Sequence, residues 1–399
     1  MKLEAYDSVV ILSPFHWNFR DDMWQTTHHI AREFSRLCPT VLVEPAVQWN
    51  ARAEHFRVYR LLNCLVGSQT RSPSENLVVF RRRSLPLGRF KTIRDFDLRR
   101  NARTLREFLS KCGFQRTLLW HSFPYWSERL IEAVDHTLFA YHCLDHTTRE
   151  EETELVRRAD AVFCVSESLV RKHRALNPHV GLLPNGVDLQ LFNHQKVQVS
   201  ERPRDLPAEG QLVGFVGTID CHLDFELLIN IAHAFPSAYL IILGYIAGER
   251  TGPQGSQREA LAKLSSLKNV RMLGFRSVDQ LPAYVNAFDV CLIPLCRDEF
   301  NQERDPAKFY QYAALGKPIV SAPVSVALRH RDLCYVVESP EEFIRCVSDA
   351  LTEPNGAALS QKRIRLARSY SWESIVARAC ELLRQIVESR QSELLCPRS

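Results

Sequence analysis

Residues 212–220 read LVGFVGTID and lead into a helical pattern that begins near Leu223. The continuous apolar run 212–216 is typical of a strand covered on both faces of a parallel sheet. Gly217 ends this strand and lets backbone approach a ligand, and the next helix offers unpaired N–H groups to an anion. The segment predicts a βα unit with a candidate phosphate site, although an ordinary strand-to-helix turn is the other interpretation.

Short apolar runs alternate with amphipathic segments on both sides of this stretch. The expected strands are 8–12, 40–43, 77–80, 117–120, 138–141, 161–165 and 180–183, and then 212–216, 239–243, 270–272, 290–293, 319–321 and 334–337. Helical patterns fill the intervals, among them 23–37, 93–111, 150–159, 225–235, 258–267 and 307–315. This alternation predicts the α/β class, with two Rossmann-like, doubly wound parallel sheets that face a cleft.

A polar, proline-containing stretch interrupts the alternation after Phe192. It predicts an N-terminal domain over 1–190, a linker over 191–210 and a C-terminal domain over 211–370. The helical pattern of 371–399 is expected to return to the N-terminal domain. In open parallel sheets ligands bind beyond the carboxyl ends of strands, so the loops that follow strands are the candidate sites.

Composition excludes several classes of protein. The 399 residues include 51 Lys and Arg against 46 Asp and Glu, and this net charge of +5 is too small to favour nucleic-acid binding. The twelve cysteines form no CxxC pair, which favours a reducing compartment over a disulfide framework. The chain opens MKLEAYD, without the basic start of a signal peptide, and has no apolar run of the ~20 residues that a membrane span needs. We therefore expect a cytoplasmic protein.

A second segment, residues 303–320, reads ERDPAKFYQYAALGKPIV. Asp305 is expected to cap a helix whose first residue is Pro306. Lys308 and Gln311 then lie three residues apart, on one face of the first turns. A lysine and an amide beside a helix N-terminus suit a diphosphate with an attached ribose, whereas a solvated helix face is the alternative.

A third segment, PNGVD at residues 184–188, is by itself a tight turn after a buried strand. Taken together, the three segments resemble the group 1 (GT4-type) retaining glycosyltransferases of the GT-B fold, which build bacterial envelope polysaccharides. The shared features are the PNGVD turn, the strand–glycine loop at 215–218, the PAK at 306–308 and the ALGKPIV at 314–320. The resemblance covers roughly residues 8 to 380 and is weakest over the first ~110.

The resemblance implies a nucleotide-diphospho-sugar donor in the C-terminal domain, transfer with retention, and no cofactor or metal. No DxD motif follows a suitable strand, and no cluster of His and Cys has the spacing of metal ligands. The implied catalytic residues are His121, beside the donor sugar, and Glu303, which contacts it; a structural histidine is the other interpretation of His121. The implied donor-binding residues are Gly217, Thr218, Gly274, Phe275, Arg304, Lys308 and Gln311.

The N-terminal domain is expected to hold the acceptor, a glycan or a lipid-linked sugar. The loop after its first strand carries aromatic and basic side chains that suit a sugar ring, with ordinary packing of the aromatic rings as the alternative: His16, Trp17 and Arg20. The basic residues 81–83 and 89–106 suit peripheral contact with anionic lipid at the inner face of the membrane, or else form a solvated helix face.

Two departures from the family pattern leave other functions open. Gln311 stands where the family has a carboxylate, and residues 218–222 lack the family's phosphate-binding Arg and Lys. Lys308 with Arg297 or Arg304 would have to supply the missing charge. The alternatives are a weak or inactive homologue that acts as a binding or scaffold protein, and a sugar-nucleotide epimerase.

Overall fold

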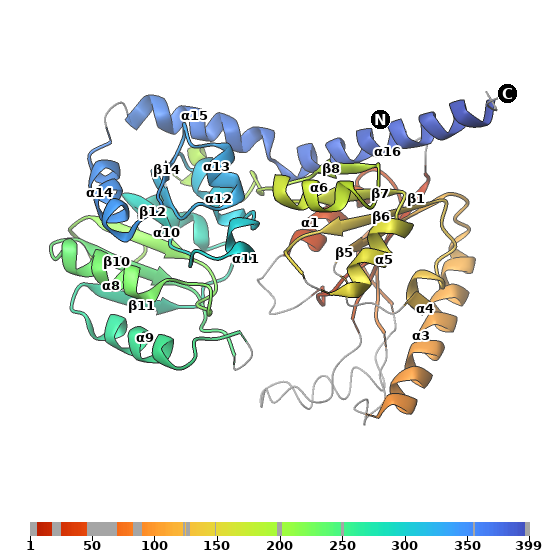
Figure 1. The fold of residues 1–399 in the computed structure, drawn as a ribbon, viewed down its shortest axis with the longest axis horizontal. Helices are drawn as coiled ribbons and strands as arrows, with labels where there is room; N and C mark the ends of the chain where they lie inside the picture. The colour runs from red at the N-terminus through yellow and green to blue at the C-terminus, as the bar shows by residue number, and fades with distance from the viewer. Residues whose placement is uncertain are drawn as a thin grey trace. The chain divides into compact units, whose positions relative to one another are not determined.

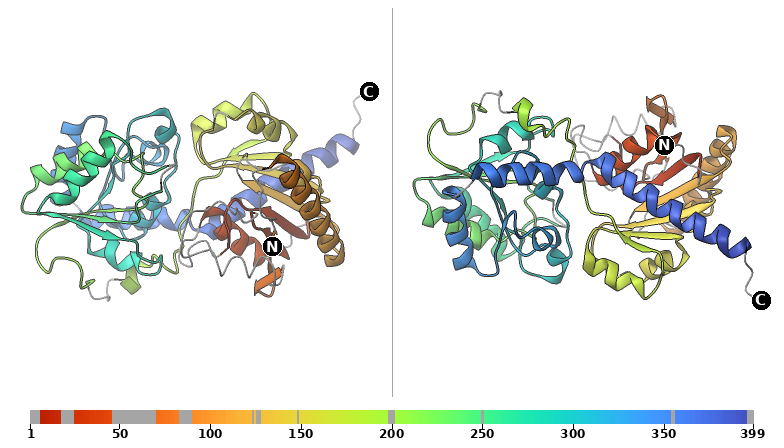
Figure 2. Two further views of the ribbon diagram at one scale, coloured as in Figure 1. Left: turned by 90° about the horizontal axis from the view of Figure 1, so that it is seen from below. Right: turned by 90° about the horizontal axis from the view of Figure 1, so that it is seen from above.

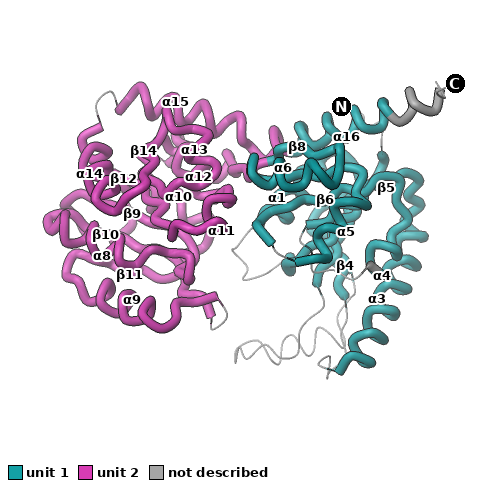
Figure 3. The backbone as a smooth tube through the Cα atoms, viewed as in Figure 1, with its two compact units in different colours: residues 1–183, 376–399 teal, residues 184–375 magenta. Residues whose placement is uncertain are grey.

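The computed structural model describes residues 6–17, 25–45, 70–82, 90–122, 124, 128–147, 149–197, 202–248, 251–353 and 356–395. Backbone contacts divide the chain into two compact units (Figure 3): unit 1 comprises residues 1–183 and 376–399, and unit 2 comprises 184–375. The stretch 191–210, expected as a linker, thus falls within unit 2. There, Asp205 bonds to Arg276 and Tyr284, so the segment is tied to the domain that follows it.

Unit 1 is built on one eight-stranded sheet (Figure 1), with strand order β3-β4-β2-β1-β5-β6-β7-β8. Its strands are β1 (Ser8–Leu12), β2 (Thr40–Val43), β3 (Thr70–Ser74), β4 (Leu77–Phe80), β5 (Thr117–Ser122), β6 (Leu138–Cys143), β7 (Ala161–Cys164) and β8 (Val180–Leu182). All pairs are parallel except β3 with β4. Its helices are α1 (Thr26–Ser35), α3 (Lys91–Cys112), α4 (Glu128–Ile131), α5 (Glu150–Arg158) and α6 (Glu167–Arg174).

Unit 2 is built on a six-stranded parallel sheet with order β11-β10-β9-β12-β13-β14. Its strands are β9 (Leu212–Val216), β10 (Tyr239–Leu243), β11 (Val270–Gly274), β12 (Val290–Ile293), β13 (Ile319–Ser321) and β14 (Tyr335–Val336). Its helices are α7 (His194–Val197), α8 (Phe225–Ala234), α9 (Ser256–Ser266), α10 (Leu281–Ala287), α11 (Glu299–Gln302), α12 (Ala307–Ala314), α13 (Ser325–Arg329), α14 (Pro340–Leu351) and α15 (Gly356–Ser369).

The strand order of unit 2 is the doubly wound order in which the winding reverses between the first and fourth strands, here β9 and β12. Unit 1 has the same reversal between β1 and β5. Figure 2 shows that helices cover both faces of each sheet, which is why the central strands are continuous apolar runs. The predicted α/β class with two parallel sheets is confirmed.

The last helix, α16 (Trp372–Leu395), begins in unit 2 and ends in unit 1. Within unit 1, the hydroxyl of Tyr6 lies 3.2 Å from Cys380 Sγ, and Gly181 leaves room for the side chain of Leu382. The C-terminal helix therefore packs on the N-terminal domain, as expected. No described helix is both long and apolar enough to cross a membrane.

Candidate donor site

Three adjacent strands of unit 2 end in glycines with positive φ. Gly217 follows β9 (φ 149°), Gly244 follows β10 (φ 156°) and Gly274 ends β11 (φ 71°). The N–H of Gly217 donates to the carbonyl of Leu243, and the N–H of Gly244 donates to that of Gly274, both at 2.9 Å. A Cβ on Gly244 would lie 1.8 Å from the carbonyl oxygen of Gly217, so only glycine fits this close approach. At the carboxyl edge of the sheet, next to the point where the strand order reverses at β9, these three strands therefore end in residues without side chains.

Lys308, on the first turn of α12, reaches this edge from a distant part of the sequence. Its ammonium nitrogen lies 4.1 Å from the centroid of the Phe215 ring and 2.5 Å from the point that a Cβ on Gly217 would occupy. A ring face attracts a cation, so Phe215 holds the ammonium over the glycine turn. The structure thus brings together the two segments from which the sequence predicted a phosphate site.

The ammonium of Lys308 is only weakly stabilised by its surroundings. Burial, followed by the positive charge of Arg304, lowers the pKa of Lys308 to about 7, while the carboxylate of Asp220 opposes this shift. A lysine near half-protonation beside unhindered backbone is poised to gain charge when an anion arrives. The position therefore favours an anionic ligand.

Arg304 supplies a second positive charge next to Lys308. Its guanidinium lies 5.5 Å from the Phe300 ring centroid and donates to Asn301 Oδ1 at 3.4 Å. The same Phe300 ring also stacks on the imidazole of His222, with ring centroids 4.5 Å apart. Phe300 thus connects the loop after β9 to the segment that carries Arg304.

Asp305 has a different role from the one the sequence predicted. The N-cap of α12 is Pro306 and its first residue is Ala307, so the expectation that Asp305 caps the helix is wrong by one position. The buried carboxylate of Asp305 instead accepts the Tyr310 hydroxyl at 2.9 Å and the backbone N–H of Asn185 at 2.6 Å. These bonds fix the start of α12.

Asn185 belongs to the PNGVD turn, which is more than a turn in the folded chain. Its side-chain amide donates to the carbonyl of Asp305 at 2.6 Å, in addition to the backbone bond. The adjacent Gly186 lies against Trp372, where a Cβ would approach the indole to 2.8 Å. Sequence reasoning missed this clamp, because the partners lie 120 residues apart. The joint presence of PNGVD and DPAK was the available signal.

The other predicted donor residues lie in unit 2 as follows. Thr218 directly follows Gly217 and is partly buried, and Gln311 lies on α12 one turn after Lys308, also partly buried. Gly274 and Phe275 are exposed at the end of β11, and the Phe275 side chain is 38% exposed. Glu303 is the partly buried C-cap of α11.

His121 lies on β5 in unit 1, next to the reversal point of that sheet. It is completely buried, with its ring 6.1 Å from that of Tyr141 and 6.5 Å from that of Phe139. Burial lowers its pKa to about 3, so the imidazole is neutral at physiological pH. These surroundings are those of a core histidine, and a role toward the donor sugar stays a prediction.

His16 and Trp17, predicted on the acceptor side, are held by Glu44 at the end of β2. The carboxylate of Glu44 lies 3.5 Å from His16 Nδ1 and accepts the backbone N–H of Trp17 at 2.8 Å. Burial alone would raise the pKa of Glu44, but His16, the Trp17 amide and Arg81 together lower it. Sequence reasoning missed Glu44. Arg20 lies outside the described residues.

Comparison with known proteins matches the second unit to one family and the whole fold to several enzymes. Residues 210–353 match the family model "Glycosyl transferases group 1". The chain is 26% identical over 235 residues to the "Putative teichuronic acid biosynthesis glycosyltransferase TuaH" of Bacillus subtilis, covering 57% of each chain. It is 26% identical over 242 residues to the D-inositol 3-phosphate glycosyltransferase of Mycolicibacterium smegmatis, covering 56% of this chain and 52% of that one. The chain thus spans little more than half the length of the curated relatives it matches.

Two solved structures illustrate the likeness of fold. Sucrose-phosphate synthase from Thermosynechococcus elongatus aligns with a TM-score of 0.71 at 16% identity, over 96% of this chain and all of the other. Anabaena Alr3699/HepE, solved in complex with UDP and glucose, aligns with a TM-score of 0.63 at 14% identity, over 95% and 100%. The fold is that of the GT-B glycosyltransferases, and the resemblance to group 1 glycosyltransferases is confirmed, with unit 2 carrying the match to their family model.

Proposed function

We propose that this protein is a glycosyltransferase that moves a sugar from a nucleotide-diphospho-sugar to an acceptor hydroxyl. The observation that carries the proposal is the ammonium of Lys308 above the Gly217 turn, beside the reversal point where doubly wound sheets bind ligands. The family model over residues 210–353 and the glycosyltransferase relatives support the same reaction class.

In this proposal the diphosphate is the leaving group, and its growing negative charge must be stabilised. Lys308, the backbone N–H groups at the start of α12 and the neighbouring Arg304 supply positive potential there. Transfer would then need no metal. The exposed edge at Gly274 and Phe275 receives the base, Thr218 lies beside the diphosphate, Gln311 faces the ribose and Glu303 faces the sugar.

We further propose retention of the anomeric configuration, as in the group 1 family. The departing phosphate takes the proton of the acceptor hydroxyl while the new bond forms on the same face of the sugar. The loop of unit 1 that carries His16 and Trp17 receives the acceptor, a glycan or a lipid-linked sugar. The role of His121 toward the donor sugar rests on the resemblance to the group 1 family alone. Trp17 offers an aromatic face of the kind that packs on sugar rings.

The first test is a thermal-shift screen of UDP-, GDP- and ADP-sugars, followed by incubation with the labelled donor that binds. Label passed to an acceptor supports a transferase. An altered free donor would instead indicate an epimerase, and binding without turnover a binding protein. A retained anomeric configuration in the product, and turnover in chelator, test the finer points of the mechanism.

The second test compares two lysines. Lys308→Ala is expected to weaken donor binding by about 10–100-fold, the contribution of a charge-assisted hydrogen bond. Lys317→Ala is the matched control, because Lys317 is also partly buried, with a pKa lowered by burial, but precedes β13 at its amino end. If Lys308→Ala bound the donor as tightly as the wild type, the proposal that Lys308 binds the diphosphate would be wrong.

Contact with anionic lipid is a separate proposal, and it concerns α3 in unit 1. Arg99, Arg103 and Arg106 are exposed there, and the Phe96 side chain is 57% exposed. Arg81 and Arg82, by contrast, face Glu44 and so do not add to this surface, while Arg83 and Arg89 lie outside the described residues. Cosedimentation with vesicles rich in phosphatidylglycerol, against neutral vesicles, tests it. Binding at low salt that is lost in Arg99→Glu/Arg103→Glu is expected.

A further inference from the structure

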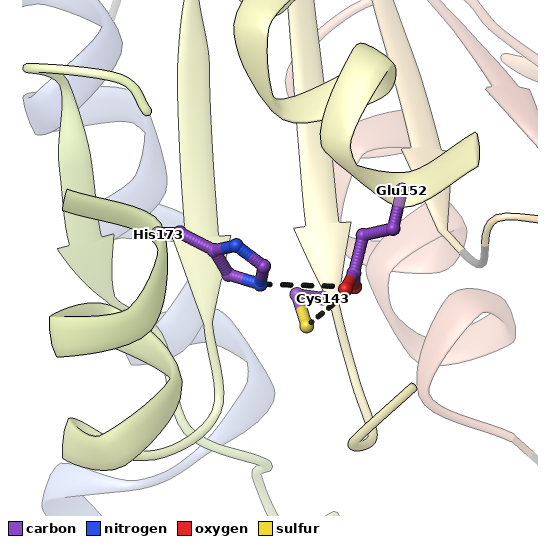
Figure 4. Close-up of side chains that lie close together, drawn as sticks. All are labelled: Cys143, Glu152 and His173. Carbon is purple, nitrogen blue, oxygen red and sulfur yellow. Dashed lines mark hydrogen bonds and ion pairs between the residues drawn. The ribbon is translucent and has the colours of Figure 1, made fainter. Parts of the chain in front are cut away.

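Three buried side chains of unit 1 point toward one another from three different elements (Figure 4). Cys143 ends β6, Glu152 lies in the first turn of α5, and His173 lies near the end of α6. Each is between 1% and 2% exposed. The thiol, carboxylate and imidazole ligand atoms all lie within 4.8 Å of one another. None of these residues belongs to the donor site of unit 2.

We propose that Cys143, Glu152 and His173 form a structural zinc site. Thiolate sulfur, imidazole nitrogen and carboxylate oxygen are the ligands that zinc takes in proteins. Zinc–sulfur distances of about 2.3 Å and zinc–nitrogen or zinc–oxygen distances of about 2.0–2.1 Å place tetrahedral ligand atoms roughly 3.3–3.6 Å apart. Here Cys143 Sγ lies 3.3 Å, and His173 Nε2 3.7 Å, from Glu152 Oε1. These two separations lie within about 0.4 Å of the tetrahedral values, which are roughly 3.55 Å for sulfur to oxygen and roughly 3.35 Å for nitrogen to oxygen.

The neighbours of Glu152 are placed to orient it. The hydroxyl of Tyr141 donates to Oε1 at 2.9 Å, and the ammonium of Lys172 lies 3.4 Å from Oε2. Hydrogen bonds of this kind fix the direction in which a ligating carboxylate points. Lys172 is 37% exposed, so water solvates its ammonium group. This weakens its repulsion of a zinc ion bound to Oε1 of the same carboxylate.

Binding of the ion replaces one proton. In the metal-free protein the thiol of Cys143 donates to Glu152 Oε1. When Zn²⁺ binds, this proton leaves to solvent, and bonds form from zinc to the thiolate, the carboxylate oxygen and the neutral imidazole. Zinc with one thiolate and one carboxylate carries no net charge, which suits a buried position. The fourth ligand is a water molecule, which completes the tetrahedron without adding charge.

The experiment uses the full-length protein, stripped with chelator and titrated with Co²⁺ or Zn²⁺. We expect a near-ultraviolet thiolate-to-cobalt band that saturates at about one equivalent, its displacement by Zn²⁺, and a rise in melting temperature with zinc. Cys143→Ala should lose the band. The control Cys346→Ala, which removes a buried cysteine of the other unit, should keep it.

The competing explanation is a buried hydrogen-bonded cluster that packs α5 and α6 on the sheet. Under that explanation the stripped wild type gives no cobalt band and zinc leaves its melting temperature unchanged. Either result, or a band of equal strength in Cys143→Ala, overturns the proposal. His173→Gln keeps a hydrogen-bonding side chain and is expected to weaken zinc binding at least about tenfold, which provides a second readout if Cys143→Ala does not fold.

Discussion

At the scale of single residues, Lys308 makes the proposed donor site sensitive to pH. Its pKa is about 7 in the free protein, and an adjacent diphosphate raises it because the anion stabilises the charged form. Between the free and the bound pKa, donor binding therefore takes up a proton and affinity falls as pH rises. Below the free pKa the affinity is flat, since a nucleotide-diphospho-sugar itself does not titrate there.

Calorimetry measures this uptake. At about pH 8 roughly nine-tenths of Lys308 is neutral in the free protein, so donor binding should take up close to one proton. The binding enthalpy will then vary with the ionisation enthalpy of the buffer, and Lys308→Met will remove this dependence. A wild type whose enthalpy is the same in phosphate and Tris buffers would contradict the prediction.

Gln311 tests the placement of the ribose. No hydrogen bond joins its side-chain amide to a described residue, so the amide is available to a ligand on the Lys308 face of α12. Gln311→Glu would convert neutral hydrogen bonds to ribose hydroxyls into charge-assisted ones and tighten donor binding by about fivefold, or ~1 kcal/mol. Gln302→Glu, on the exposed surface of α11, controls for the added negative charge. Titration calorimetry with both variants decides, and weaker binding for Gln311→Glu alone would place the ribose elsewhere.

At the scale of elements, α12 is held at its start by a buried carboxylate. Asp305→Ala would remove the buried acceptor of the Tyr310 hydroxyl and of the Asn185 backbone N–H, together with the carboxylate that lies 3.6 Å from Arg329. Breaking such a buried charged network costs about 3–5 kcal/mol of unfolding free energy. Asn185→Ala removes only the side-chain bond to the Asp305 carbonyl and is expected to cost about 1 kcal/mol.

Urea unfolding monitored by circular dichroism measures both losses. Glu259→Ala, on the exposed surface of α9, is the control and should change the unfolding free energy by less than about 0.5 kcal/mol. If Asp305→Ala were as stable as this control, the clamp on α12 would carry no energetic weight.

The elements also show what sequence can and cannot predict. Apolar runs with both faces covered gave strand bounds that agree with the structure, as in β1, β9 and β12. The edge strand β3 reads TRSPS and is mostly exposed, so no apolar period marks it. The strand forms because its backbone pairs with β4, and not because its side chains are buried.

The candidate site divides in the same way. Gly217 and Lys308 were predictable because each carries a local signal, a strand end and a helix start. Glu44 and the bond of Asn185 to Asp305 were not, because they depend on partners brought together only by the folded chain. The zinc ligands are the same case, since Cys143 and His173 lie in separate elements with no characteristic spacing.

At the scale of the whole molecule, the two proposed ligands bind to different units: the donor to unit 2 and zinc to unit 1. The glycines at the ends of β9, β10 and β11 lie in unit 2 together with Lys308, whereas β6, α5 and α6 lie in unit 1. A nucleoside diphosphate without its sugar should therefore slow amide exchange in residues 215–220 and 305–311, and leave residues 138–143 unchanged. Zinc should do the opposite, slowing exchange around β6, α5 and α6 alone. Hydrogen–deuterium exchange read by mass spectrometry resolves both segments in one digest, and nucleotide protection confined to unit 1 would show that the donor binds to the other sheet.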